Sequence, residues 1–342
     1  MNGSSREKNP HILGSCTGCG YCFLLCPQNA VQFVEDSGYR INGNLCTNCG
    51  KCVFACPVDA VASVPGSCYG TEQPEWQQLE DRGYDAVVIG AGIGGLFSAA
   101  ALSRKGKRTL LVERLNFAGG RFTHFDYQGV AINTGACHAV PFGKRGPFAE
   151  MIRSLKLPVQ VISAGGMGGL FVSGKHYPWK GIMDFTAPFS RQEKRELQKL
   201  VSQVLRPKQY RERGYSFGRW LESHTTSKLI RSFFDRMFIF GCSIGIDDID
   251  CSEAIEIIKR VYRAKAPGMI KGGCGFLIEK LVDQLHSLGG KVLTETEVIS
   301  IITKTGQVGG VKLRNRKTGA VKTLASKLVI SDVGPRDTFK LL

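Results

Sequence analysis

The apolar residues between Ala86 and Leu102 are interrupted by glycines in a pattern that predicts a strand, a turn and a helix. A continuous apolar run over Tyr84–Ile89 is typical of a strand buried on both faces. A helix over Gly94–Lys105 and a second strand over Thr109–Glu113 follow. The stretch is apolar enough to resemble a membrane span, but its glycine pattern favours a strand–helix–strand unit in a soluble protein.

The glycines of this turn have the spacing G-x-G-x-x-G between a predicted strand and a predicted helix. Gly90 permits the tight turn, Gly92 lets the backbone approach a diphosphate, and Gly95 lets the helix pack closely on the strand. The helix N-terminus offers free N–H groups to an anion. Glu113 ends the second strand, where a carboxylate can accept hydrogen bonds from ribose hydroxyls. The pattern therefore predicts a dinucleotide site.

A second pattern, with the period of a helix, lies between Arg191 and Arg213. Five apolar positions there form one stripe: Leu197, Leu200, Val201, Val204 and Leu205. The stripe predicts an amphipathic helix with a basic opposite face. We favour a helix packed on its own domain, and a helix lying on a membrane surface is the alternative. The phenylalanine-rich run Ser232–Gly245 is expected to be core, or to line an apolar substrate tunnel.

Two cysteine-rich segments near the N-terminus repeat each other. "CTGCGYCFLLCPQNAV" starts at Cys16 and "CTNCGKCVFACPVDAV" starts at Cys46, and nine of the sixteen aligned positions are identical. Each has the spacing C-x2-C-x2-C-x3-C-P of bacterial ferredoxins. Structural zinc is the alternative, but zinc ligands usually come as two pairs separated by a longer gap. The repeat predicts two [4Fe–4S] clusters.

In two-cluster ferredoxins the fourth cysteine of each run ligates the other cluster. On that pattern Cys16, Cys19, Cys22 and Cys56 hold one cluster, and Cys46, Cys49, Cys52 and Cys26 hold the other.

The composition agrees with a globular protein of two or three domains in 342 residues. The first fourteen residues contain no apolar core typical of a secretory signal. Eight of the 13 cysteines lie in the two repeats, so metal ligation in a reducing cytoplasm is the favoured interpretation, rather than disulfides. Residues 67–82 are rich in Pro, Gly and polar side chains, which predicts a linker with a short helix at Glu75–Asp81.

The net charge of +16 is unevenly distributed along the chain. Residues 1–67 hold four basic and four acidic side chains, whereas Lys175–Arg236 holds fourteen basic and six acidic ones. Such an excess can attract nucleic acid, an anionic membrane surface or acidic substrates. No recognisable nucleic-acid-binding motif accompanies it, so we expect no nucleic-acid partner.

The segment "VERLNFAGGRF" resembles the amine-oxidase-like FAD proteins, and within them the phytoene desaturase, carotenoid isomerase and retinol saturase branch. Gly119-Gly120-Arg121 provides a turn and a guanidinium that can face phosphates. "INTGACHAV" (Ile132–Val140) resembles the segment of that family that passes close to the flavin. "KGGCGFLIEKLVDQLHSLGGKVLTETEVISII" resembles its return to the nucleotide domain, with Val298 where the backbone would meet the adenine, and "LVISDVGP" (Leu328–Pro335) resembles a later strand.

The resemblance runs from Tyr84 to the end and implies an α/β FAD-binding Rossmann-like domain with an inserted α+β substrate domain. A small α+β two-cluster ferredoxin domain precedes it. The expected boundaries are 1–66 for the ferredoxin domain, 67–82 for the linker, 83–142 for the first part of the FAD domain, 143–271 for the substrate domain and 272–342 for the return. Family members continue past "LVISDVGP" into a glycine-rich stretch at the flavin, so the chain is expected to be truncated or completed by another segment.

The candidate dinucleotide residues are Gly90, Gly92, Gly94, Gly95, Glu113, Arg114, Gly120, Arg121 and Val298. His138, beside the segment expected near the flavin, is the candidate catalytic acid, and His124 is a weaker one. A structural histidine is the alternative for both.

Together the two cofactors predict an FAD-dependent oxidoreductase that passes electrons between [4Fe–4S] clusters and FAD. The resemblance implies an apolar, isoprenoid- or carotenoid-like substrate whose C=C bonds are reduced or desaturated, with the direction left open. The expected partner is a ferredoxin-like one-electron donor or acceptor, with a peripheral membrane contact left open. The alternatives are an electron-transfer subunit without its own substrate and an amine-oxidase-type flavoenzyme.

Overall fold

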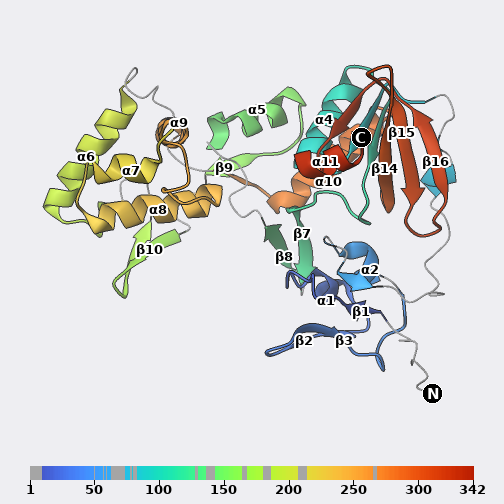
Figure 1. The fold of residues 1–342 in the computed structure, drawn as a ribbon, viewed down its shortest axis with the longest axis horizontal. Coiled ribbons are helices and arrows are strands. Elements are labelled where there is room, and N and C mark those ends of the chain that lie inside the picture. The colour runs from blue at the N-terminus through green and yellow to red at the C-terminus, as the bar shows by residue number, and fades with distance from the viewer. Residues whose placement is uncertain are drawn as a thin grey trace. The chain divides into compact units, whose positions relative to one another are not determined.

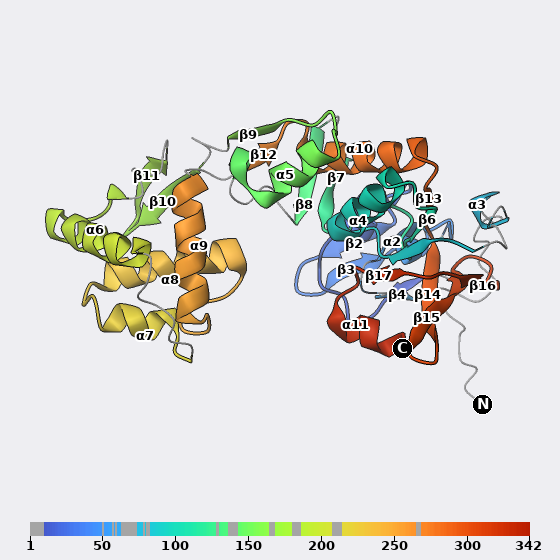
Figure 2. The same ribbon diagram turned by 90° about the horizontal axis from the view of Figure 1, so that it is seen from above.

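The chain forms two compact units in a computed structural model (Figures 1 and 2). The first unit comprises Met1–Cys137, Arg153–Val159 and Gly272–Leu342, and the second comprises His138–Ile152 and Gln160–Lys271. The structure describes residues 10–49, 51–56, 58, 60–62, 74–77, 79, 83–127, 130–135, 143–163, 168–179, 186–206, 214–264 and 268–342.

The N-terminal part of the first unit is built from two similar halves. In each half a short helix carries the third cysteine of the repeat: α1 (Tyr21–Leu25) carries Cys22 and α2 (Lys51–Ala55) carries Cys52. Two antiparallel pairs complete the domain: β1 (His11–Ile12) with β4 (Val61–Ala62), and β2 (Val31–Val34) with β3 (Gly38–Ile41). Its small core contains cysteines as well as apolar residues, including Cys22, Val31, Cys52, Cys56, Ala60 and Val61.

A four-stranded parallel sheet with the order β13-β6-β5-β17 forms the centre of the first unit. Its strands are β5 (Ala86–Ile89), β6 (Thr109–Val112), β13 (Lys291–Leu293) and β17 (Val329–Ser331). The first two strands are buried at every position, which explains their continuous apolar sequence. Helices α4 (Ile93–Arg104) and α10 (Gly273–Ser287) pack against each other. The structure thus confirms the predicted Rossmann-like strand–helix–strand unit.

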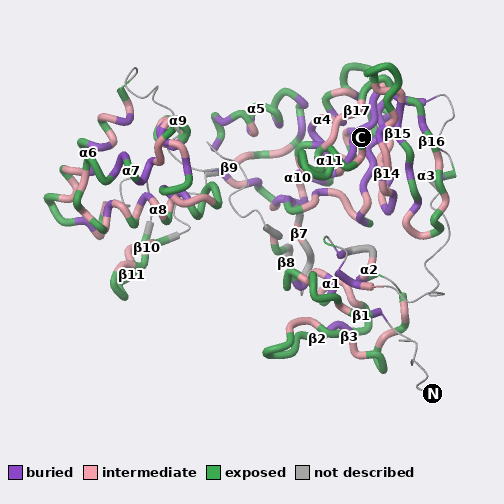
Figure 3. Tube along the Cα trace, in the orientation of Figure 1, coloured by how far each residue is buried: buried purple, intermediate pink, exposed green. Residues whose placement is uncertain are grey.

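A three-stranded antiparallel sheet and a hairpin complete this unit. The sheet is formed by β14 (Thr296–Lys304), β15 (Gln307–Asn315) and β16 (Val321–Ala325), and Figure 3 shows buried positions along β14 and β15. The hairpin joins β7 (Phe122–Tyr127) to β8 (Val130–Gly135), and α11 (Pro335–Lys340) lies near the C-terminus.

The short helix α3 (Pro74–Gln77) lies in the predicted linker, and its Trp76 is 1% exposed within the apolar core of this unit. The Lys322 ammonium lies over the Trp76 ring and donates a hydrogen bond to the Trp76 carbonyl at 2.8 Å. The chain after the cluster domain is therefore fixed to the antiparallel sheet.

The second unit is mainly helical. It contains the 3-10 turn η1 (Gly143–Arg145), α5 (Pro147–Ser154) as far as Ile152, and the helices α6 (Arg191–Leu205), α7 (Phe217–Glu222), α8 (Lys228–Cys242) and α9 (Cys251–Ala264). Two antiparallel strand pairs accompany them: β9 (Val161–Ser163) with β12 (Gly268–Ile270), and β10 (Gly168–Val172) with β11 (Lys175–Trp179).

The amphipathic helix predicted from Arg191 is α6, which ends at Leu205; residues 207–213 of the prediction lie outside the described residues. Leu197, Leu200 and Val204 of its apolar stripe are buried in the core of the second unit, as we favoured, and Val201 packs against that core. Leu205 is partly exposed. In the phenylalanine-rich run Phe234 and Phe238 are also core residues, whereas Phe240 is 64% exposed. Within the described ranges no helix has the length and apolar character needed to span a bilayer.

Candidate functional site

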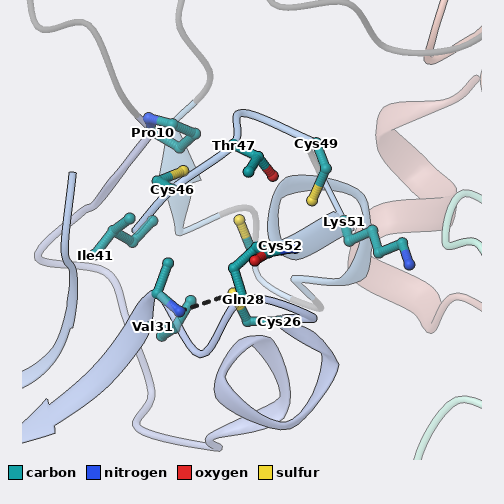
Figure 4. Close-up of a pocket in the computed structure, with 11 residues that line it drawn as sticks. Pro10, Cys26, Gln28, Val31, Ile41, Cys46, Thr47, Cys49, Lys51 and Cys52 are labelled. Carbon is teal, nitrogen blue, oxygen red and sulfur yellow. Dashed lines mark hydrogen bonds between the residues drawn. The ribbon is translucent and has the colours of Figure 1, made fainter. Parts of the chain in front are cut away.

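The cysteines of the second repeat share a pocket with the last cysteine of the first repeat. Cys46, Cys49 and Cys52 line this pocket together with Cys26, and Val31 and Ile41 contribute apolar walls. Figure 4 shows the sulfur atoms of these four cysteines around the pocket. The fold thus brings together the four residues that the crossed ligation pattern assigns to one cluster.

The surroundings of Cys22 and Cys52 match the same crossed pattern. The pKa of Cys22 is raised to about 11, first by burial and then by the nearby thiols of Cys19, Cys16 and Cys56. The pKa of Cys52 is raised to about 12, first by burial and then by the thiols of Cys22, Cys46, Cys49 and Cys26. The fourth cysteine of each run therefore lies near the other run, as crossed ligation requires.

Backbone amides point at the same sulfur positions in both repeats. The N–H groups of Ala30 and Ala60 lie 3.2 and 3.1 Å from the sulfurs of Cys26 and Cys56. The N–H groups of Gly18 and Asn48 both lie 3.4 Å from the first cysteine of their run. Hydrogen bonds to ligating sulfur are one of the main ways in which a protein sets the potential of an iron–sulfur cluster.

Zinc is the alternative metal that such cysteines could bind. A zinc site holds its sulfur ligands about 2.3 Å from a single ion. Two sets of four cysteines in crossed order fit cubane clusters, which present four separate iron corners to their ligands.

The glycine loop at the start of α4 has the geometry that its sequence predicts. Gly90 has φ +92°, which favours glycine. A Cβ atom on Gly95 would lie 2.0 Å from the Gly90 carbonyl oxygen, so the helix can approach the strand only with glycine there. The glycines therefore hold the loop close to the N-terminus of α4, an arrangement in which backbone N–H groups can bind a diphosphate.

A second glycine turn lies against this loop. The Gly119 N–H donates a hydrogen bond to the Ala91 carbonyl at 2.7 Å, and Gly119 pairs with Gly92 in a parallel bridge. A Cβ atom on Gly120 would lie 3.7 Å from the Gly92 Cα atom. The next residue, Arg121, is exposed. Arg121 therefore directly follows the turn that contacts the glycine loop.

Glu113 joins the end of β6 to the glycine loop. Its Oε2 atom accepts a hydrogen bond from the Ala91 N–H at 2.7 Å, and its Oε1 atom accepts one from the Leu115 N–H at 2.9 Å. An ionised carboxylate has about four acceptor sites, so Glu113 retains capacity to accept from ribose hydroxyls while it holds the loop.

Asp332 is a site residue that the sequence analysis did not identify. A Cβ atom on Gly92 or on Gly94 would lie within 2.6 Å of one of its carboxylate oxygens. Its side chain therefore borders the phosphate cradle, and it can accept hydrogen bonds from a dinucleotide's hydroxyl groups. A signal did exist: Asp332 directly follows a strand of the parallel sheet, and ligands of such sheets bind at the carboxyl ends of their strands.

For the remaining candidate residues, the described part of the structure shows no position beside the glycine loop. Val298 is buried in β14 opposite Leu313, and the Arg114 carbonyl accepts a hydrogen bond from Arg316 at 3.0 Å. The buried Nδ1 atom of His124 faces Gly275 of α10 and has no hydrogen-bond partner among the described residues. His138 lies outside the described residues, so its catalytic role stays a prediction.

Two family models match parts of the chain. A 4Fe–4S dicluster domain matches residues 15–60, and an NAD(P)-binding Rossmann-like domain matches residues 88–155.

Curated relatives cover much of the chain at modest identity. An uncharacterized protein of Methanocaldococcus jannaschii is 31% identical over 211 residues, which is 62% of this chain and 51% of that protein. Prolycopene isomerase 2 of an Oncidium hybrid cultivar is 23% identical over 312 residues, 80% of this chain and 52% of the isomerase. All-trans-retinol 13,14-reductase of Rattus norvegicus is 53% identical over 51 residues, 15% and 8% of the two proteins. The chain spans about half the length of the first two.

Solved structures show the same fold. An oxidoreductase from Methanosarcina mazei has a TM-score of 0.64 at 28% identity, over 75% of this chain and 60% of that one. A putrescine oxidase variant has a TM-score of 0.58 at 15% identity, over 76% and 60%. The chain therefore joins a 4Fe–4S dicluster domain to an NAD(P)-binding Rossmann-like domain, is similar in sequence to a prolycopene isomerase, and shares the fold of a putrescine oxidase.

Proposed function

We propose that the chain works as an FAD-dependent oxidoreductase whose clusters exchange electrons with the flavin to reduce or desaturate C=C bonds of an apolar, isoprenoid-like substrate. The observation that carries the proposal is the presence, in one compact unit, of two crossed sets of cysteines and a glycine cradle for a dinucleotide. A cluster passes electrons singly and a flavin can exchange two with an organic substrate. The combination suits a one-electron protein partner better than a nicotinamide.

The residues of the cradle fit FAD. Gly90, Gly92 and Gly95 would let the backbone of the loop and the helix N-terminus approach the diphosphate, Arg121 would offer a charge-assisted contact to it, and Glu113 can accept from the ribose. Bound FAD would supply hydride chemistry toward carbon. The role of this chain's residues would be to bind the dinucleotide and to orient it.

The linker supports coupling between the two cofactor sites. Trp76 fixes the chain to the flavin-type domain, and Ala62 still belongs to the cluster domain. The twelve residue steps from Ala62 to Pro74 reach at most about 40 Å. A tether of this length keeps the two domains at a high effective concentration.

The substrate class rests on the names of the relatives. A prolycopene isomerase and an all-trans-retinol 13,14-reductase act on apolar polyenes, and the second is named as a reductase. In the direction of reduction, two reduced one-electron donors and two protons from solvent would balance the saturation of one C=C bond, with bound FAD supplying the hydride chemistry. Desaturation would run the same balance in reverse, with two electrons passed to one-electron acceptors and two protons released to solvent.

The test compares the full protein with a form that lacks residues 1–70, both purified without oxygen. Both forms are expected to retain FAD, but only the full protein should show flavin reduction by a low-potential one-electron donor in stopped-flow absorbance. Equal reduction rates would show that the clusters do not transfer electrons to the flavin. Release of NAD instead of flavin on denaturation would show that the cofactor assignment is wrong.

A further inference from the structure

One aromatic contact joins the first cysteine repeat to the dinucleotide domain. The rings of Tyr21 and Phe117 lie with their centroids 4.9 Å apart and their planes at 54°. Both residues are partly buried and belong to the same compact unit. Aromatic pairs at such distances contribute to packing beyond the area that they bury.

The two rings come from segments that carry the cofactor ligands. Tyr21 begins α1 and directly precedes Cys22, a ligand assigned to the cluster of Cys16, Cys19 and Cys56. Phe117 precedes by two residues the turn in which the Gly119 N–H bonds to the Ala91 carbonyl of the glycine loop. The contact thus connects a cluster ligand to the wall of the phosphate cradle through few covalent steps.

The second repeat lacks this feature. The position equivalent to Tyr21 is Lys51, which is exposed and lines the pocket of Cys26, Cys46, Cys49 and Cys52. A cation suits contact with an acidic protein surface in water, whereas an aromatic ring suits burial against another ring. The two repeats therefore differ at the position through which Tyr21 contacts Phe117.

We propose that the two clusters have different roles: the cluster of Cys16, Cys19, Cys22 and Cys56 exchanges electrons with the flavin across the Tyr21–Phe117 contact, and the other cluster exchanges them with the external one-electron partner. This inference rests on the proposed function. In the direction of flavin reduction, two electrons from two reduced donors pass singly through both clusters, and with one proton from solvent they complete the reduction of FAD. In the opposite direction each step is reversed.

The test uses the full protein loaded with iron, sulfide and flavin. Tyr21→Ala and Phe117→Ala are compared with Phe23→Ala, which also removes an aromatic ring from α1. Phe23 is 41% exposed and its ring lies 6.0 Å from that of Tyr39 inside the cluster domain. Loss of the contact should lower the stopped-flow rate of flavin reduction about three- to tenfold, as expected when an aromatic pair that holds two domains together is removed. Phe23→Ala and Tyr21→Phe, which keeps the ring, should retain the rate.

A second readout needs neither flavin nor turnover. Hydrogen exchange of the backbone amides of residues 114–121 reports whether the contact covers the glycine turn. Exchange should become faster in Tyr21→Ala and stay unchanged in Phe23→Ala. If Tyr21→Ala loses its clusters, the rate measured with Phe117→Ala tests the inference instead, because Phe117 lies outside the cluster domain.

The outcomes separate this inference from the proposed function. Equal flavin reduction with and without residues 1–70 refutes the proposed function and the inference with it. Dependence on residues 1–70 with unchanged rates in Tyr21→Ala and Phe117→Ala refutes the inference alone. An equal loss of rate in Phe23→Ala also refutes it, because the effect would then not belong to this contact.

Discussion

The carboxylate of Glu113 accepts a hydrogen bond from the backbone N–H of Ala91 at 2.7 Å, which ties the end of β6 to the glycine loop after β5. The same side chain is 8% exposed and accepts a second bond from Leu115. Glu113 therefore shapes the cradle in the protein itself, in addition to the expected contact with a ribose. A loss of dinucleotide binding on its removal would combine both effects.

Glu113→Ala is predicted to lower the free energy of unfolding by on the order of 3 kcal/mol, because it leaves two backbone donors without their charged acceptor. Glu113→Gln keeps one carbonyl oxygen and should lose less. Urea unfolding of the protein without flavin measures this effect separately from binding. Equal stability of the wild type and Glu113→Ala would show that the two hydrogen bonds contribute nothing to the fold.

Gly95→Ala should be far more harmful than Gly94→Ala, although the two glycines are neighbours in one helix. The new methyl at Gly95 meets a backbone carbonyl oxygen at 2.0 Å, whereas at Gly94 it meets the carboxylate of exposed Asp332, which can rotate away. We expect a loss above about 3 kcal/mol at Gly95, the upper end of ordinary overpacking. At Gly94 the change should stay within about 1 kcal/mol. Thermal unfolding of both variants decides, and similar losses would contradict the close helix–strand packing.

Local patterns predicted the local structure. The strand, turn and helix around Gly90 were predicted within two residues at each boundary, because burial on both faces and glycine spacing are both encoded in neighbouring residues. The crossed cysteine sets were also predicted, and the neighbours of Cys22 and Cys52 match them. In both cases a known spacing of residues in the sequence was enough to predict the contacts.

Contacts between distant segments could not be predicted in this way. Asp332 borders Gly92 although the two are 240 residues apart in the sequence, and only the parallel pairing of β17 with β5 brings them together. Trp76 lies in a segment whose composition indicates a linker, yet its side chain is fully enclosed. The polar composition of residues 67–82 predicts exposure on average and does not identify the one large ring that is buried.

Trp76→Ala is predicted to destabilise the flavin-type domain by about 3–5 kcal/mol, as expected for a buried aromatic side chain. It should also free the linker from the antiparallel sheet, since Lys322 loses the ring beneath it. Gln77→Ala is the matched control, because that neighbour is exposed and should change stability by less than about 0.5 kcal/mol. Chemical unfolding measures both, and a small effect of Trp76→Ala would mean that α3 is not anchored in solution.

Crossed ligation predicts which pairs of cysteine substitutions remove one cluster and which remove two. Cys16 and Cys56 are assigned to the same cluster, so the double variant Cys16→Ala, Cys56→Ala should keep about four of about eight irons. Cys16 and Cys26 are assigned to different clusters, so replacing both with alanine should remove nearly all iron. Uncrossed ligation predicts the opposite pair of results. Anaerobic iron and sulfide analysis of the two double variants therefore decides between the arrangements, and zinc in place of iron would exclude both.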